Sequence, residues 1–194
     1  MSLDEVDWKI IKHLQLNGRK TFKELGEAIG FTGLGARKRL DRLLEQDVIQ
    51  ISTLVNIENL DLQLALILLE METAADRRRT INRYRDCPRI INLFTTLGGY
   101  NLVVLMMAEN QDTLECESME ICSLRSGEGI RRSEFYPIGK VYYSPYLPLR
   151  SFQIERNNVT PCGVDCKNCE GFQIKKCLGC PSTSYYKGPL KPIV

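Results

Sequence analysis

Five cysteines lie close together near the C-terminus, in the run PCGVDCKNCEGFQIKKCLGCP. Their spacing is C-x3-C-x2-C-x7-C-x2-C, and they are Cys162, Cys166, Cys169, Cys177 and Cys180. A C-x2-C loop places two thiolates on one ion, and two such loops supply a tetrahedral set of four sulfurs. Disulfide pairing would leave one of the five thiols over. The spacing therefore predicts a metal site in this segment.

Two kinds of metal centre fit this spacing. Zn²⁺ takes four ligands, most simply Cys166, Cys169, Cys177 and Cys180, and Cys162 is then the extra thiol. A 4Fe–4S cluster is the alternative, because the C-x3-C-x2-C triplet and the proline after the last cysteine are typical of iron–sulfur proteins. We predict zinc first and keep the cluster open. Either metal would stabilise a segment that is too short to bury a sufficient core alone.

The composition is that of an ordinary globular protein, with 43% apolar and 26% charged residues. A formal net charge of +2 is too small to indicate a nucleic-acid partner by itself. The apolar run from Leu64 to Leu69 is far shorter than a membrane span requires. The first ten residues have neither the basic nor the apolar region of a secretion signal, so we expect a cytoplasmic protein with reduced thiols.

Residues 1–52 predict three helices. Thr21 and Glu24 form a capping box that begins a short second helix, and Thr32 caps a third helix that runs to about Gln46. Two short helices joined by a tight turn, the second with a basic outer face, are typical of a helix-turn-helix. The outward-facing and flanking residues of the third helix are Leu34, Arg37, Lys38, Arg39 and Arg42. A solvated face of a small helical bundle is the alternative interpretation.

Residues 3–49 resemble the N-terminal domain of the Lrp/AsnC family of transcription regulators. The matching residues are Leu3, Asp4, Asp7, Ile10, Leu14, Gln15, Asn17, Gly18, Arg19, Glu24, Leu25, Gly30, Arg39, Arg42, Leu43, Val48 and Ile49. The resemblance implies a winged helix-turn-helix that binds double-stranded DNA. The candidate DNA-binding residues are Thr32, Leu34, Arg37, Lys38, Arg39 and Arg42. Gly33 and Gly35 offer no side chain to a base, which favours binding dominated by phosphate contacts or by DNA deformation.

Residues 53–150 predict an α+β domain. The first strand lies within residues 55–71, and a helix over 74–87 ends before Pro88. Strands over 90–97 and 102–108 form a hairpin around Gly98-Gly99, a helix covers about 112–124, and the last strand lies within 130–141. This β-α-β-β-α-β order is the ferredoxin-like arrangement. Cys87, Cys116 and Cys122 are isolated in the sequence, and we interpret them as buried small hydrophobic residues.

The same stretch resembles the ligand-sensing domain of the Lrp/AsnC family. That resemblance implies a homodimer or higher homo-oligomer formed through the sheet, with an amino acid or related small molecule as effector. Gly99, Tyr100 and Asn101 stand where the family has a turn that lines the effector pocket. Asn101 replaces an aspartate there, so an unmodified amino acid is a less secure effector.

Three parts follow from these patterns: a helix-turn-helix domain over 1–52, a ferredoxin-like domain over 53–150, and a linker with a cysteine-rich knuckle over 151–194. The function we predict is a DNA-binding transcription regulator, with a metal site that is structural or senses redox state. Siroheme decarboxylases resemble this architecture, but the α+β domain contains no histidine to act as acid or base. A module that binds RNA or protein through the cysteine-rich tail is the other alternative. We therefore predict a regulator rather than an enzyme.

Overall fold

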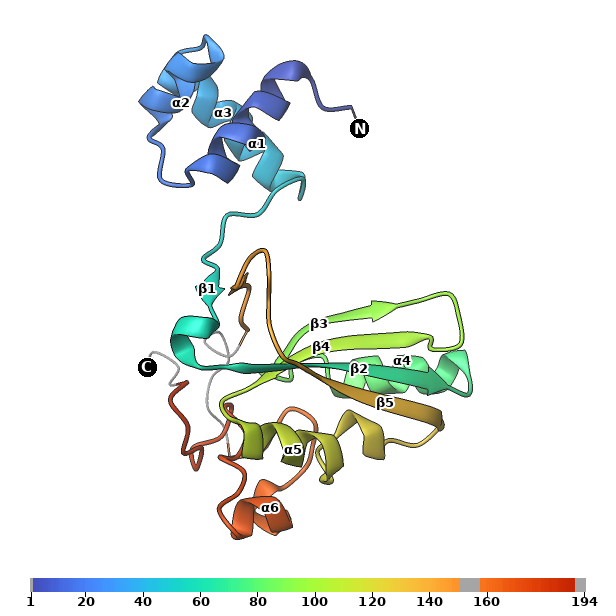
Figure 1. Ribbon diagram of the computed structural model, residues 1–194. Helices are drawn as coiled ribbons and strands as arrows, with labels where there is room; N and C mark the ends of the chain where they lie inside the picture. Colours follow the sequence, from blue (N-terminus) through green and yellow to red (C-terminus); the bar gives the residue numbers. More distant parts are fainter. Residues whose placement is uncertain (1, 151–157, 191–194) are drawn as a thin grey trace. The chain divides into compact units, whose positions relative to one another are not determined.

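The structure, a computed structural model, describes residues 2–150 and 158–190 (Figure 1). The chain divides into two compact units, residues 1–53 and 54–194. The cysteine-rich tail belongs to the second unit, together with the α+β domain. Of the linker and tail predicted over 151–194, residues 151–157 and 191–194 lie outside the described residues.

The first unit contains three helices, as predicted: α1 (Glu5–Leu16), α2 (Phe22–Ile29) and α3 (Gly33–Glu45). The side chains of Asp4, Thr21 and Thr32 cap their N-termini by accepting hydrogen bonds from the first-turn amides. The core between the helices consists of Ile10, Leu25, Ile29, Ala36, Leu40 and Leu43. These positions recur at helical spacing, so burial of one apolar face of each helix holds the unit together.

The turn between α2 and α3 is tight. A Cβ atom on Gly26 would lie 2.7 Å from the carbonyl oxygen of Phe31 and 2.9 Å from the amide nitrogen of Gly33, so only glycine fits there. Residues 46–54 contain no strand. The predicted wing is therefore not formed in these residues, and the unit is a three-helix helix-turn-helix without it. The extended chain after α3 instead leads directly into the second unit.

The second unit contains a four-stranded antiparallel sheet in the order β3-β4-β2-β5. Its main elements are β2 (Gln63–Met71), α4 (Ala74–Arg83), β3 (Ile90–Thr95), β4 (Leu102–Ala108), α5 (Gln111–Met119) and β5 (Ile130–Ile138). This order and topology confirm the predicted ferredoxin-like fold. Short elements complete the unit: β1 (Val55–Asn56), η1 (Glu58–Leu60), η2 (Leu124–Ser126), β6 (Tyr146–Leu147), η4 (Cys166–Asn168) and α6 (Glu170–Gln173). Strands β1 and β6 pair with each other.

Helices α4 and α5 cover one face of the sheet (Figure 1). Along β2 the core positions on that face alternate as Ala65, Ile67, Leu69 and Met71, which follows from the period of two in a strand. The other face is partly open. The apolar side chains on it that are only partly buried or exposed include Leu66, Leu68, Phe94, Val103, Leu105 and Tyr136.

The cysteine-rich tail packs beside α5 (Figure 1). Lys176 forms an ion pair with Glu115 at 2.7 Å, and the amide of Gly171 donates to Glu120 at 3.2 Å. The hydroxyl of Tyr186, which is buried, donates to the carboxylate of Glu109 at 2.6 Å. The tail is therefore fixed to the α+β domain by polar contacts at several points. Among the described helices, none combines the length and apolar character that a membrane span requires.

Candidate functional site

The outer surface of α3 presents the side chains that were predicted to face DNA. Leu34 is 65% exposed, and Arg37 and Lys38 are exposed as well. Arg37 stands near Asp41 (3.6 Å), with its guanidinium 5.8 Å from the ring centroid of Phe22. In the part of the chain that the structure describes, Lys38 forms no ion pair. Thr32 serves as the helix cap, because its hydroxyl accepts from the amide of Gly35 at 3.1 Å.

The other two predicted cations of α3, Arg39 and Arg42, contact carboxylates of the first helix region. Arg42 donates to both carboxylate oxygens of Asp7 at 2.6 and 2.7 Å. Arg39 donates to Asp4 at 2.6 Å and to Asp7 at 3.1 Å. Asp7 is only 1% exposed, so these pairs lie between the helices. Two of the predicted DNA contacts therefore hold α1 against α3.

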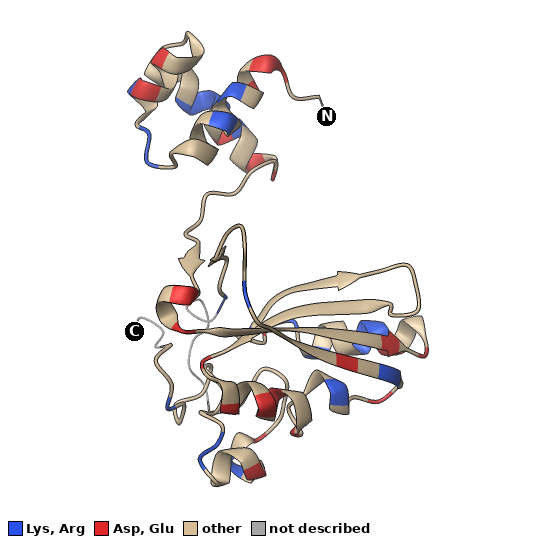
Figure 2. Ribbon diagram, in the orientation of Figure 1, with Lys and Arg blue, Asp and Glu red and all other residues tan. Residues whose placement is uncertain are grey.

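Figure 2 shows both acidic and basic residues on the helices of the first unit. Asp4 and Asp7 compensate Arg39 and Arg42, whereas Arg37 and Lys38 are exposed and, among the described residues, Arg37 is paired only with the partly exposed Asp41 of its own helix. Their exposure at the second turn of α3 places positive charge beside Leu34 and the helix N-terminus. This small basic surface suits contacts to a phosphate backbone.

The predicted effector turn follows strand β3. Asn101 uses its side-chain amide on the backbone of Met71: it donates to the carbonyl at 2.9 Å and accepts from the amide at 3.0 Å. This double contact lies where the pairing of β2 with β5 shifts register. Tyr100 donates its hydroxyl to Glu134, and the guanidinium of Arg132 lies 4.3 Å from its ring centroid. Gly99 is exposed. Asn101 therefore has a role in holding the strands together, whatever the turn binds.

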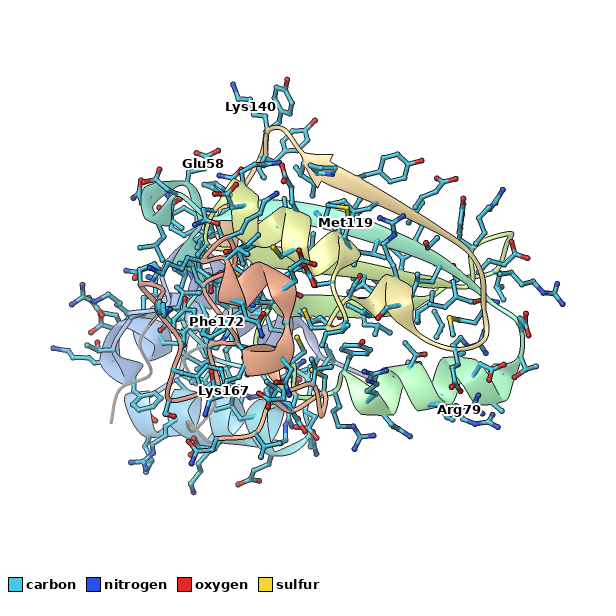
Figure 3. The ribbon with its side chains drawn as sticks, turned by 90° about the horizontal axis from the view of Figure 1, so that it is seen from below. Glu58, Arg79, Met119, Lys140, Lys167 and Phe172 are labelled. Atoms are coloured by element: carbon cyan, nitrogen blue, oxygen red, sulfur yellow. The ribbon has the colours of Figure 1, made fainter. Side chains whose placement is uncertain are left out.

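All five cysteines of the tail line one small cavity of about 30 Å³. Cys87, from the loop after α4, and Cys122, from the loop after α5, line the same cavity. Sequence reasoning missed these two, because no spacing connects them with the tail. The eighth cysteine, Cys116, is buried beside Gly171 but does not line the cavity. In Figure 3 sulfur atoms gather beside the tail segment that carries Phe172 and Lys167.

Backbone amides face the sulfurs of four tail cysteines. The amide of Gly179 donates to the sulfur of Cys177 at 3.4 Å. Burial raises the pKa of Cys166 to about 12, although the amide of Cys180 donates to its sulfur and opposes the rise. Burial likewise raises the pKa of Cys169 and Cys180, against amides that donate to their sulfurs. Amide donors of this kind stabilise thiolates, so these four sulfurs are suited to ligate a metal.

No three cysteine, histidine, aspartate or glutamate side chains among the described residues are close enough to hold one ion as they stand. The thiol of Cys169 instead donates to Glu120 at 3.3 Å. The thiol of Cys180 and the hydroxyl of Ser182 are 3.0 Å apart. These side chains would have to turn toward the cavity to ligate a metal. Within the Cys177–Cys180 turn, Gly179 has a left-handed φ of +83°, which glycine adopts without strain.

A buried arginine connects the cysteine cavity to the sheet. Arg89 lines the cavity and is 3% exposed, and it donates to Glu109 at 2.9 Å and to Glu117 at 2.7 Å. It also donates to the carbonyl oxygen of Gly179 at 2.6 Å, between the last two cysteines. Burial alone would lower the pKa of Arg89. The carboxylates of Glu109 and Glu117 raise the pKa by more, so it lies well above its ordinary value. The guanidinium is therefore a fixed positive charge beside the thiols.

A helix-turn-helix unit followed by a ferredoxin-like domain defines a class of DNA-binding transcription regulators, and the comparisons with known proteins agree. Residues 3–44 match the AsnC-type helix-turn-helix domain. The chain is 30% identical over 133 residues to the HTH-type transcriptional regulator FL11 of Pyrococcus abyssi, which covers 66% of this chain and 86% of FL11. It is 29% identical over 113 residues to the HTH-type transcriptional regulator Ptr1 of Methanocaldococcus jannaschii, which covers 58% of this chain and 76% of Ptr1.

A solved structure shows the same fold. AsnC of E. coli superposes with a TM-score of 0.65 at 18% identity, over 74% of this chain and 96% of that one. This protein belongs to the Lrp/AsnC family of transcription regulators. The family resemblance is thereby confirmed, and so is the prediction of a regulator rather than an enzyme. About a quarter of this chain has no counterpart in the AsnC structure.

Proposed function

We propose that this regulator binds double-stranded DNA through α3, with Arg37 and Lys38 neutralising phosphates. Thr32 and Leu34, near the N-terminus of the helix, are then the residues that approach base edges. The exposure of these side chains, while Arg39 and Arg42 pair with Asp7, is the observation that supports this assignment. Because so few side chains reach the bases, phosphate contacts supply most of the affinity.

We propose further that the protein is a homodimer formed through the open face of the sheet. Phe94 is 47% exposed and Tyr136 is 49% exposed, and both lie on this face beside partly buried leucine and valine side chains. An apolar surface of this kind favours association with a second copy. Two helix-turn-helix units would then bind half-sites separated by about one helical turn of DNA, or multiples of it.

A small-molecule effector is the third part of the proposal. A solved transcriptional regulator from Neisseria meningitidis, NMB0573, is in complex with L-Met, and it superposes on this chain with a TM-score of 0.65 at 22% identity. That regulator covers 76% of this chain, and 97% of its own length is matched. In this chain Gly99 and Tyr100 would line the effector pocket. The side chain of Asn101 is engaged by the backbone of Met71, so Gly99 and Tyr100 would contribute most of the contacts of this turn to an amino acid or a related molecule.

The tail is proposed to bind Zn²⁺ through Cys166, Cys169, Cys177 and Cys180, with a 4Fe–4S cluster as the alternative. The amides that face these four sulfurs support this set. Cys162, which lines the same cavity, is then the extra thiol. We infer that the protein works in the cytoplasm, where its DNA target lies and thiols stay reduced.

The experiment that tests DNA binding is a salt titration of affinity for DNA from upstream of the protein's own gene. Lys38→Ala removes one phosphate contact per chain, so in a dimer we expect the slope of log affinity against log salt to flatten by about two units. Lys140→Ala, an exposed lysine of the second unit, is the matched control and should leave the slope unchanged. Equal affinity for RNA, or an unchanged slope for Lys38→Ala, would overturn the proposed interface.

A further inference from the structure

The cysteine cavity contains more thiols than one zinc ion can use. Seven cysteines line it, five from the tail and two, Cys87 and Cys122, from the α+β domain. A tetrahedral zinc ion takes four thiolates, so three thiols would remain around it. The inference that follows rests on the proposed metal site in the tail and extends it to the domain.

Cys87 and Cys122 line the cavity from the α+β domain. The amide of Arg89 donates to the sulfur of Cys87, against the burial that raises the pKa of this thiol. Burial and the carboxylate of Glu117 raise the pKa of Cys122, whose thiol donates to Glu117 at 3.9 Å. Both thiols are therefore next to the buried Arg89, Glu109 and Glu117 network that also holds the Cys177–Cys180 turn.

We propose that this cavity holds a dinuclear zinc–thiolate centre to which the α+β domain contributes Cys87 and Cys122. Two tetrahedral ions have eight ligand positions, and six thiolates fill them when two of the sulfurs bridge both ions. Six of the seven cysteines that line the cavity would be ligands, and one would remain a free thiol. The seven sulfurs that line this cavity of about 30 Å³ are the observation that supports the centre.

The charge around the cavity is consistent with such a centre. Six thiolates and two Zn²⁺ ions carry a net charge of about −2, since each zinc offsets two thiolates. The Arg89 guanidinium, buried beside Cys177 and Cys180, compensates part of this charge. The backbone amides that donate to the sulfurs stabilise the remaining negative charge. Zinc would release the thiol protons and turn the sulfurs inward.

Such a centre would join the tail to the sensing domain. Ligands from the loop after α4, the loop after α5 and both Cys-x2-Cys turns would meet at the same two ions. Metal binding would then stabilise the whole second unit and not the tail alone, because the folded arrangement of both parts is needed to assemble the ligands.

Zinc stoichiometry of the full-length protein tests the proposal. The reduced chain is loaded anaerobically with Zn²⁺, desalted and analysed for metal, and circular dichroism establishes that each variant is folded. We expect about two zinc ions per chain in the wild type and one or fewer in the Cys87→Ser/Cys122→Ser variant. Cys116→Ser, a buried cysteine outside the cavity, is the matched control and should keep two.

A cobalt measurement on the wild-type chain is independent of any variant. Two Co²⁺ ions that share bridging sulfurs couple magnetically, so the EPR signal per cobalt should fall as the second ion binds. One zinc per chain, unaffected by Cys87→Ser/Cys122→Ser, would overturn the dinuclear centre while leaving the proposed tail site intact. Absence of any bound metal would overturn both the dinuclear centre and the proposed zinc site in the tail. An iron–sulfur cluster in place of zinc would also overturn the dinuclear centre.

Discussion

Removing the buried Arg89 should destabilise the second unit strongly. In Arg89→Leu the carboxylates of Glu109 and Glu117 lose their cation while both remain buried, with side-chain exposures of 0% and 8%. The carbonyl oxygen of Gly179 also loses its donor at 2.6 Å. Breaking a buried ion pair from one side costs about 3–5 kcal/mol, because an uncompensated charge is left behind.

This cost has a clear signature in a thermal melt. The second unit covers residues 54–194, and for a unit of about this size 1 kcal/mol shifts Tm by about 2–4 °C. Arg89→Leu is therefore expected to lower the Tm of the second unit by about 10 °C at constant metal content. Arg78→Leu, at an exposed arginine of α4, is the control and should change the free energy of unfolding by no more than about 0.5 kcal/mol.

A compensating variant separates the lost ion pair from lost packing. Replacing Arg89 with leucine together with Glu109→Gln and Glu117→Gln removes the stranded charges, so more than half of the lost Tm should return. Differential scanning calorimetry resolves the transitions of the two units. A melt of Arg89→Leu within about 1 °C of the wild type, or no recovery in the triple variant, would show that this network does not hold the tail to the sheet.

Two further substitutions distinguish structural roles from binding roles. Arg42→Ala should lower the free energy of unfolding of the first unit by about 1 kcal/mol, since it removes a two-point ion pair to buried Asp7 that solvent partly screens. Urea unfolding measures this, and Lys38→Ala should leave the midpoint unchanged; the reverse pattern would contradict the assignment. Asn101→Asp should cost about 1–3 kcal/mol in the second unit, because a carboxylate cannot donate to the Met71 carbonyl. Asn92→Asp, at an exposed site where the side chain only accepts, is its control, and equal midpoints would refute the argument.

Local chemistry made much of the fold predictable. The capping box of Thr21 and Glu24 and the cap at Thr32 begin α2 and α3 at the expected residues, because these side chains satisfy the free amides of the first turn. The hairpin around Gly98 was predicted from its flanking apolar runs. Helix α4 ends at Arg83, earlier than expected, and Tyr84 caps it with a non-helical backbone (φ −103°, ψ 10°).

The ion pairs of α3 were not predictable from its own sequence. A helical wheel places Arg42 on the outer face and Arg39 on a flank, but it contains no information about the neighbouring helix. Asp7 is 35 positions away from Arg42 in the chain and becomes its partner only when α1 packs against α3. Long-range pairing of this kind depends on tertiary packing, so the sequence of α3 alone does not show which of its cations are paired within the protein.

The cysteine site also depends on residues that are far apart in the sequence. Spacing within the tail identified five thiols, because a short loop brings its two ends together whatever the rest of the chain does. Cys87 and Cys122 have no such spacing, and they reach the cavity because the loops after α4 and α5 end on the same side of the sheet. Isolated cysteines in the sequence are thus interpretable only once the fold is known.

Arg89 explains why the tail and the domain act as one unit. Of its carboxylate partners, Glu109 lies between β4 and α5 and Glu117 lies within α5, and its third partner is the backbone between Cys177 and Cys180. One buried side chain therefore orients the Cys-x2-Cys turn against the helix that carries Glu117, while Tyr186 fixes the chain beyond the turn to Glu109. Arg89 binds both the cysteine turn and Glu117 of α5. A ligand that displaces the cysteine turn would therefore strain the contacts of Arg89 with α5, so occupancy of the cavity and the packing of α5 on the sheet are coupled.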